Sequence, residues 1–303
     1  MSATVSIALQ AAVCAVRDGR PLTLTLPGPP PALPAGPFDP ARDRTLELGL
    51  RRNVEEQAAL PLGYVEQLYT FGDRGRGGDA SGHAVSVGYL ALTRQGAGKG
   101  WLGWYDAFPW EDWRAERPAV LDEHILPALT RWVEHAPDAH PPSRALPRRT
   151  RMRLAFGDDP WDEERVLERY ELLYEAGLVR EAVEDGRAEE NALHERTGRA
   201  MAHDHRRILA TAIARLRAKA KYRPVVFELM PETFTLTELQ TVVETIFGRA
   251  LYKPNFRRLV ERNALVEPTG RRTEGGSGRP ALLYRFRRAV IEERPAPGLR
   301  VGR

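Results

Sequence analysis

A chain of 303 residues is long enough to form two domains with substantial cores, which excludes a small disulfide-stapled protein. Hydrophobic residues make up 42% of the sequence and charged residues 28%, as is typical of a globular protein, and the apolar runs fall short of the roughly 20 residues that cross a bilayer. The single cysteine, Cys14, excludes a disulfide framework, and the N-terminus has no basic segment ahead of its apolar residues, so we expect a cytoplasmic protein with no membrane partner.

The positive charge is concentrated near the C-terminus. The net charge of the whole chain is +4, but between Arg249 and Arg288 eleven Lys or Arg residues stand against three Glu, a net charge of +8. The remaining chain is therefore acidic. This asymmetry favours an anionic partner for the C-terminal part, with nucleic acid as the first candidate and a solvated basic face as the plainer interpretation.

The first hundred residues predict a mixed α/β domain. Residues 5–16 and 21–26 form a hairpin signal around Asp18-Gly19. Half of residues 27–40 are proline, which predicts a stiff surface loop because proline supplies no backbone donor to a sheet. The apolar spacing then predicts a helix over Leu46, Leu50 and Val54, and strands at 64–71, 83–93 and 101–104, with a Gly- and Arg-rich turn at 72–82.

From about residue 110 to 216 the pattern becomes helical. Val166, Tyr170 and Leu173 share one helical stripe, and His205, Leu209 and Leu216 share another. The stretch at 137–147 is a proline-rich, polar break. Residues 183–198 are nearly all polar, so we expect them at the surface.

The C-terminal eighty residues predict a winged helix-turn-helix. Thr235 and Glu238 form a capping box that opens a helix, and Gly248 ends it. Pro254 suits the start of a second helix. Residues 264–267 and 281–286 then predict two short strands around a glycine-rich basic loop at 269–280. Helix, turn, helix, strand, loop and strand is the order of a winged helix.

The second helix of such a unit enters the major groove, where the bases present their specific hydrogen-bonding patterns. Asn255 is suited to paired hydrogen bonds with adenine, and Arg257 or Arg258 to guanine. The remaining basic residues are suited to contacts with phosphates or the minor groove; these are Lys253, Arg271, Arg272 and Arg279. The plainer interpretation is a protein-interaction module whose arginines are merely solvated.

The run FELMPETFTLTELQTVVETIFGRALYKPNFRRLVERNALVEPTG, closed by GRPALLYRF, resembles the winged helix of the Nudix-related transcriptional regulators of NAD metabolism, the NrtR type. The stretches YVEQLYTFGDRGRG and VSVGYLAL resemble the segments that follow the Nudix box in that family. The middle, about 110–199, is longer than in typical members and resembles the larger alphaproteobacterial regulators of the NadQ type. The resemblance implies an α+β protein: an N-terminal Nudix-like α/β/α sandwich with a helical insertion, residues 1–218, followed by a C-terminal winged helix-turn-helix, residues 222–303.

The Nudix box itself is degenerate. Active Nudix hydrolases carry Arg-Glu-X-X-Glu-Glu on a helix, whose carboxylates hold the divalent ions that activate water. Here the aligned stretch runs from Arg52 to Gln57, so that Glu56 remains while Asn53 and Gln57 replace the other two carboxylates. Glu55 is turned about 100° from Glu56 on a helix and is a poor substitute. We therefore expect no hydrolysis, no catalytic residues and no metal, although acids of the middle segment, Glu163, Glu164 or Glu168, leave open an active hydrolase of a nucleotide diphosphate.

The candidate ligand residues are basic or hydrogen-bonding groups. Arg52 and Glu56 remain from the box, with a simple surface ion pair as the plainer interpretation. Arg74 and Arg76 lie where the resemblance puts phosphate-facing arginines, which match diphosphate oxygens well. His205 stands in HDHRRIL, which resembles a stretch of the family's interdomain helix, although a histidine on an apolar stripe is more often a satisfied core residue.

We therefore expect a transcriptional regulator with no required cofactor. It binds a double-stranded palindromic operator through its winged helix and senses a nucleotide effector, NAD, ADP-ribose or ATP, in the inactive Nudix-like domain. Repression of NAD-biosynthesis genes and a homodimeric state are what the resemblance implies. The alternatives are the hydrolase and a protein-interaction module without a DNA role.

Overall fold

The computed structural model describes residues 5–71, 83–94, 100–135, 146–157, 161–274, 280–293 and 298–299. The predicted turn at 72–82, with Arg74 and Arg76, lies outside these residues. So do Arg279 and most of the proline-rich break at 137–147.

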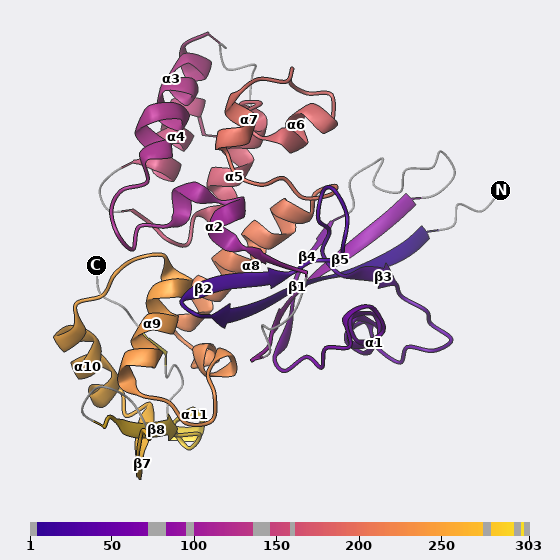
Figure 1. Ribbon diagram of the computed structural model, residues 1–303. Coiled ribbons are helices and arrows are strands. Elements are labelled where there is room, and N and C mark those ends of the chain that lie inside the picture. The colour runs from indigo at the N-terminus through magenta and orange to yellow at the C-terminus, as the bar shows by residue number, and fades with distance from the viewer. Residues whose placement is uncertain are drawn as a thin grey trace.

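A six-stranded sheet forms the N-terminal part of the protein (Figure 1). Its order is β4-β5-β1-β2-β6, with β3 also paired to β1, and β1 and β5 run parallel. The predicted hairpin between β1 and β2 is confirmed, and both turn residues, Asp18 and Gly19, have the positive φ that an Asp-Gly hairpin turn requires. The strands are β1 Val5–Arg17, β2 Arg20–Leu24, β3 Ala35–Pro37, β4 Val65–Phe71, β5 His83–Leu92 and β6 Trp101–Gly103.

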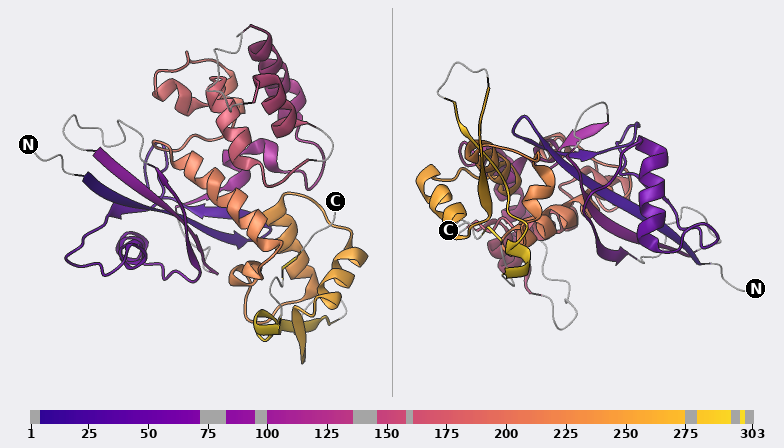
Figure 2. Two further views of the ribbon diagram at one scale, coloured as in Figure 1. Left: turned by 180° about the vertical axis from the view of Figure 1, so that it is seen from behind. Right: turned by 90° about the horizontal axis from the view of Figure 1, so that it is seen from below.

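One helix covers each face of the sheet, as the right-hand view of Figure 2 shows. Helix α1, Leu46–Ala58, packs Leu50 and Val54 against Leu9 and Val13 of β1. Alternate residues of the same strand belong to the core on the other face, where helix α8, His205–Ala220, lies. The predicted α/β/α sandwich is therefore confirmed.

The proline-rich segment is not the simple surface loop that the sequence predicted. Pro31, Leu33 and Pro34 are buried, and Ala35–Pro37 forms strand β3. A proline has no backbone N–H to donate, but its carbonyl still accepts hydrogen bonds. The carbonyl of Pro34 accepts the N–H of Ala11 at 2.9 Å. The N–H of Phe38, which is not a proline, donates to the carbonyl of Ile7 at 2.9 Å, so the segment pairs with β1 in both directions.

A helical insertion packs against α8 (Figure 1). The polar stretch 183–198 does not lie wholly at the surface, because His194 and Thr197 are buried and hydrogen-bonded to the carbonyls of Gly177 and Leu178. Helix α2, Trp104–Ala107, precedes the insertion, which contains the 3-10 helix η1 Pro109–Glu111, the π-helix η2 Leu121–Ile125, α3 Leu126–His135, α4 Arg148–Phe156, α5 Val166–Glu175, α6 Arg180–Glu184 and α7 Leu193–Arg196.

The C-terminal part is a winged helix. The predicted capping box of Thr235 and Glu238 is present with both hydrogen bonds, and Gly248 ends the helix at a φ of 70°. Arg271 and Arg272 end strand β7 instead of lying in the loop, since the strand pairing continues past a bulge to Arg272. The elements are the 3-10 helix η3 Val225–Leu229, α9 Leu236–Phe247, α10 Lys253–Arg262, β7 Val266–Arg272, β8 Leu282–Phe286 and α11 Val290–Glu293.

One continuous apolar core joins the α8 face of the sheet, the insertion and the winged helix. It includes Leu90 of the sheet, Leu173 of the insertion, Leu216 of α8 and Val243 of α9. Among the described residues, no helix combines the length and apolar character needed to cross a bilayer.

Helix α1 ends in a strained residue, and this generates a stability prediction. Ala59 has a φ of 51°, the left-handed conformation in which glycine carries no side-chain penalty. We expect Ala59→Gly to raise the free energy of unfolding by about 0.5 to 1 kcal/mol in urea titrations. The neighbouring Ala58→Gly, inside the helix, should lower it by a similar amount, about 0.5 to 1 kcal/mol. Equal effects of the two substitutions would contradict this reading.

Candidate nucleic-acid interface and ligand site

Helix α10 separates an apolar face from a basic one. Phe256 and Val260 are buried in the winged-helix core, at the spacing that puts both on one side of a helix. The opposite side is solvent-exposed and carries five basic or amide side chains. These are Lys253, Asn255, Arg257, Arg258 and Arg262.

The side chains of this face are available to a partner to different degrees. Asn255 accepts a hydrogen bond from Arg258 at 2.7 Å, so the amide orients the guanidinium beside it. Lys253 and Arg257 form no ion pair with any residue that the structure describes. An exposed cation without an internal partner keeps its full charge for an external anion.

Tyr252 is a residue of this surface that the sequence reasoning missed. It stands at the N-cap of α10 with 71% of its surface exposed, although aromatic residues are usually at least half-buried. The position of Tyr252 in the sequence could have indicated its exposure, because Phe256, Leu259 and Val260 already fill the apolar face of the helix. An aromatic residue one position ahead of the helix then has no place in the core.

The wing adds further basic groups. Arg271 and Arg272 are exposed at the end of β7, and Arg272 donates to the carbonyl of Pro280 at 2.9 Å. Arg285 of β8 instead pairs with Glu267 at 2.6 Å, which neutralises it. Six of the seven predicted DNA residues are thus exposed on α10 or at the tip of β7, and the seventh, Arg279, lies outside the described residues.

On α1, Arg52 is held by carboxylates of the protein itself. Its Nε and Nη2 donate to both oxygens of Asp43 at 2.9 and 2.8 Å, and its Nη1 donates to Glu56 at 3.2 Å. Asp43 is buried and also accepts the N–H of Asp39 at 2.9 Å. The hydrogen bonds from Arg52, followed by that from the Asp39 N–H, lower the pKa of Asp43 to about 2.

Asp43 is a second residue that the sequence reasoning missed. Gly49 makes room for it, since a Cβ at Gly49 would lie 2.6 Å from the Asp43 carboxylate. Arg52 therefore anchors the loop ahead of α1, and Glu56, which also pairs with Arg42 at 3.3 Å, belongs to the same ion network. Nothing local in the sequence distinguishes Asp43 from the other acids of this loop.

The two amides of the degenerate box bind strand β3. Asn53 donates its Nδ2 to the carbonyl of Pro37 at 3.2 Å, and Gln57 donates its Nε2 to the carbonyl of Ala35 at 2.6 Å. A Cβ at Gly36, between these two residues, would lie 2.6 Å from the Asn53 side chain. A carboxylate has no N–H to donate, so an ionised acid at either position would not form these hydrogen bonds with β3.

The acids of the middle segment do not complete this site. Glu163 and Glu164 pair with Lys221, directly after the C-terminus of α8, at 3.0 and 2.5 Å. Helix α8 lies on the face of the sheet opposite α1, so these carboxylates do not approach Asn53 or Gln57. Among the described residues, no group of three or more His, Cys, Asp or Glu side chains is arranged to hold a metal ion.

His205 lies in the core between α8 and the sheet. Its Nδ1 accepts the N–H of Leu33 at 2.9 Å, and its Nε2 is 3.3 Å from the Gln10 amide nitrogen. The histidine thus attaches α8 to the proline-rich segment and to β1. Arg52 and Glu56 lie together on α1, whereas His205 lies on the opposite face, and Arg74 and Arg76 are outside the described residues.

The winged helix matches a known family model. Residues 226–286 match the NrtR DNA-binding winged helix domain. A segment of 86 residues is 45% identical to the "ADPR responsive transcriptional repressor NtrR" of Acinetobacter baylyi, and covers 28% of this chain and 34% of that protein. The match to this curated relative thus spans about a third of its length.

Solved structures extend the similarity to the whole fold. The chain is similar to NrtR from Shewanella oneidensis complexed with a 27mer DNA, with a TM-score of 0.54 and 22% identity over 94% of this chain and 95% of that one. A MutT/nudix family protein from Enterococcus faecalis has a TM-score of 0.52 and 16% identity, over 95% and 88% of the two chains. The predicted fold is confirmed, and so is the resemblance to the NrtR-type regulators.

The contact between Asn53 and β3 generates a prediction. Asn53→Asp places a carboxylate against the Pro37 carbonyl and removes the donor, so we expect it to lower the free energy of unfolding at pH 7 by about 1 to 3 kcal/mol. Burial raises the pKa of the introduced carboxyl, so the loss should shrink as the pH falls. Gln57→Glu, the same change at an exposed position, is the matched control and should cost less. Urea titrations at pH 7 and pH 5 measure both, and equal losses would refute the argument.

The depressed pKa of Asp43 predicts a pH dependence of stability. Its ordinary value is 3.8 and its folded value about 2, so the ion pair with Arg52 stabilises the fold fully above about pH 4 and is lost as the pH falls toward 2. Wild type should be more stable than Asp43→Asn at pH 6, and the difference should narrow between pH 4 and pH 2.5. Urea unfolding across this range measures it. A difference that does not change with pH would mean that the pair is not what shifts the pKa.

Proposed function

We propose that the protein is a transcriptional repressor that binds operator DNA through its winged helix and responds to a nucleotide. The observation that carries this proposal is the basic face of α10, which lies on the helix that a winged helix inserts into the major groove. Two of its exposed cations, Lys253 and Arg257, form no ion pair with the part of the chain that the structure describes. The similarity of residues 226–286 to the NrtR DNA-binding winged helix domain supports it. NAD-biosynthesis genes are the proposed targets.

In this proposal the residues of α10 read the operator. Arg257 and Arg258 are suited to guanine, and Asn255, which orients Arg258, is suited to adenine. Tyr252, at the exposed start of the helix, contacts the DNA beside them. Lys253 and the wing residues Arg271, Arg272 and Arg279 bind phosphates, which position the protein but do not distinguish sequences.

The sensing part, residues 1–218, binds the effector without hydrolysing it, and residues 222–303 bind DNA. The Acinetobacter relative is an ADPR responsive repressor by name, so we propose ADP-ribose as the effector here, ahead of NAD and ATP. The amides Asn53 and Gln57, both engaged with β3, support a non-hydrolytic role. Arg52, Glu56, Arg74, Arg76 and His205 remain the proposed ligand residues, of which Arg74 and Arg76 are suited to the diphosphate.

A cytoplasmic homodimer completes the proposal. Two winged helices related by a two-fold axis reach major-groove half-sites about 34 Å apart, so a palindromic operator matches the symmetry of the protein. A change in the spacing of the two α10 helices then changes the affinity for such an operator.

A DNA-binding titration tests this function. The probes are the regions upstream of the protein's own gene and of NAD-biosynthesis genes, at fixed salt, with and without ADP-ribose, NAD or ATP. We expect ADP-ribose to weaken specific binding, and Arg257→Ala/Arg258→Ala to lower operator affinity at least about 30-fold, since two base contacts are lost. Arg149→Ala/Arg153→Ala, two exposed arginines of α4, removes the same charge and should leave affinity nearly unchanged.

Two outcomes would replace the proposal. Mg²⁺-dependent cleavage of ADP-ribose without specific DNA binding would establish the hydrolase instead. Binding of neither DNA nor nucleotide, by a folded protein, would leave the protein-interaction module.

A further inference from the structure

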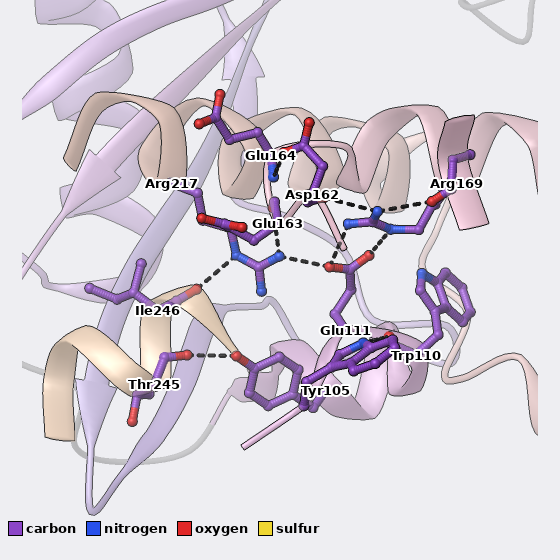
Figure 3. Close-up of polar contacts among 12 residues, drawn as sticks. Tyr105, Trp110, Glu111, Asp162, Glu163, Glu164, Arg169, Arg217, Thr245 and Ile246 are labelled. Atoms are coloured by element: carbon purple, nitrogen blue, oxygen red, sulfur yellow. Dashed lines mark hydrogen bonds and ion pairs between the residues drawn. The ribbon is translucent and has the colours of Figure 1, made fainter. Parts of the chain in front are cut away.

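Three charged side chains meet in the interior where the insertion, α8 and the winged helix converge (Figure 3). The Glu111 carboxylate accepts two hydrogen bonds from Arg169, at 2.5 and 3.0 Å, and one from Arg217 at 2.7 Å. All three side chains are at most 1% exposed. We call Glu111, Arg169 and Arg217 the Glu111 cluster.

Each arginine also holds backbone carbonyls of a different part of the protein. Arg169, on α5, donates to the carbonyls of Ala155 and Asp162 at 3.1 and 3.0 Å, and so closes the insertion on itself. Arg217, on α8, donates to the carbonyl of Ile246 in α9 at 2.8 Å and to that of Glu163 at 2.9 Å. A single carboxylate therefore links the insertion to the first helix of the winged helix.

The C-terminal end of α9 is docked at the same place. The Tyr105 hydroxyl donates to the carbonyl of Thr245 at 2.6 Å, a contact that Figure 3 draws. The backbone N–H of Trp113 donates to the carbonyl of Gly248, also at 2.6 Å. Gly248 has a φ of 70°, and a Cβ there would collide with the backbone carbonyl of Glu111. The last carbonyls of α9, which a helix leaves without partners, are thus satisfied by the sensing part.

The chemistry of the cluster favours one fixed arrangement. Two guanidinium groups share one carboxylate away from water, so a displacement of either arginine leaves a buried charge uncompensated. Buried ion pairs add little net stability compared with apolar residues, but they specify geometry, because their hydrogen bonds are directional. The cluster therefore either keeps η1, α5 and α8 in one relative position or, when its hydrogen bonds break, lets all three move.

Helix α8 connects this cluster to the proposed effector site. His205, one of the proposed ligand residues, begins the helix and binds Leu33 beside the sheet, and Arg217 lies twelve residues further along. A helix rises 1.5 Å per residue, so these two positions lie about 18 Å apart along the axis of one continuous helix. A small movement of α8 at the sheet is therefore carried to Arg217 and α9.

We propose that the Glu111 cluster is the joint that sets the orientation of the winged helix and transmits the state of the effector site to α10. The helical insertion takes part in this regulation, because it supplies both Glu111 and Arg169. The inference rests on the proposed function, and it assigns to the insertion a role in the coupling between nucleotide and operator.

Arg169→Met tests the joint, since it removes the member of the cluster that α5 supplies and leaves Glu111, α8 and α9 unchanged in sequence. We expect the variant to bind ADP-ribose as wild type does by calorimetry, and to bind the operator without effector within about threefold. The factor by which ADP-ribose weakens operator binding should fall at least tenfold, toward one.

The matched control is Arg206→Met. Arg206 is equally buried on α8 and pairs with a carboxylate of the insertion, Glu181, at 3.1 Å. Its other hydrogen bonds go to the carbonyls of Ala107 and Thr197, and none goes to a residue of the winged helix that the structure describes. The variant should lose stability and keep the wild-type factor. The triple variant Glu111→Met/Arg169→Met/Arg217→Met removes all three charges together while filling the core, and it gives the same reading if Arg169→Met does not fold.

The outcomes separate this inference from the proposed function. If wild type shows no effect of ADP-ribose, NAD or ATP on operator binding, the proposed function itself fails. If wild type responds and the folded Arg169→Met or triple variant keeps the wild-type factor, the cluster only holds the structure together and the inference is overturned.

Discussion

The burial of helix α8 is the constraint on which the rest of the structure depends. One helix packs against the sheet, the insertion and the winged helix, and it carries two arginines, Arg206 and Arg217, whose side chains have no exposed surface. A buried guanidinium requires a carboxylate and several carbonyls around it. Glu181 and Glu111, both from outside the helix, supply the carboxylates. The insertion therefore supplies the carboxylates that the arginines of α8 need in the core, although it shares Glu111 with its own Arg169.

This requirement explains why the winged helix is not an independent appendage. The carbonyl of Ile246 is one of the partners of Arg217, and Trp113 forms a short parallel bridge with Arg249 just beyond α9. A cation placed at the C-terminal end of a helix also complements the helix dipole. The orientation of α9, and with it that of α10, is thus fixed by polar contacts with α8 and with the residues that precede it.

The sequence predicted the elements whose signals are local. The capping box of Thr235 and Glu238, the end of α9 at Gly248 and the Asp18-Gly19 hairpin each depend on residues within a few positions of one another, and each is confirmed. The basic face of α10 was predictable for the same reason, because helical spacing separates Phe256 and Val260 from the arginines.

The sequence could not predict contacts whose partners are distant. Glu111 and Arg217 are 106 residues apart, and in the sequence both have the character of ordinary surface charges. The proline-rich segment also gave the wrong impression, because its composition shows the missing donors of proline but not the carbonyls that pair with β1. The positions Asn53 and Gln57 show the same limit. The sequence shows amides at these positions, but it does not show that their side chains donate to strand β3.

Arginine serves two opposite purposes in this chain, and the difference is physical. Only four of the 45 basic residues are lysine. Inside, the planar guanidinium joins a carboxylate to several carbonyls at once, which a lysine ammonium cannot match in geometry. Outside, on α10, the same group keeps its charge and its paired donors for an external acceptor.

Salt separates these two uses. Ions in solution screen exposed charges over about 8 to 10 Å at physiological ionic strength, but they do not reach a pair enclosed in the core. Rising salt therefore weakens the attraction of the α10 surface for phosphates while the Glu111 cluster stays intact. The orientation of the winged helix is consequently set by interactions that ionic strength does not disturb, and only the encounter with an anionic partner varies with it.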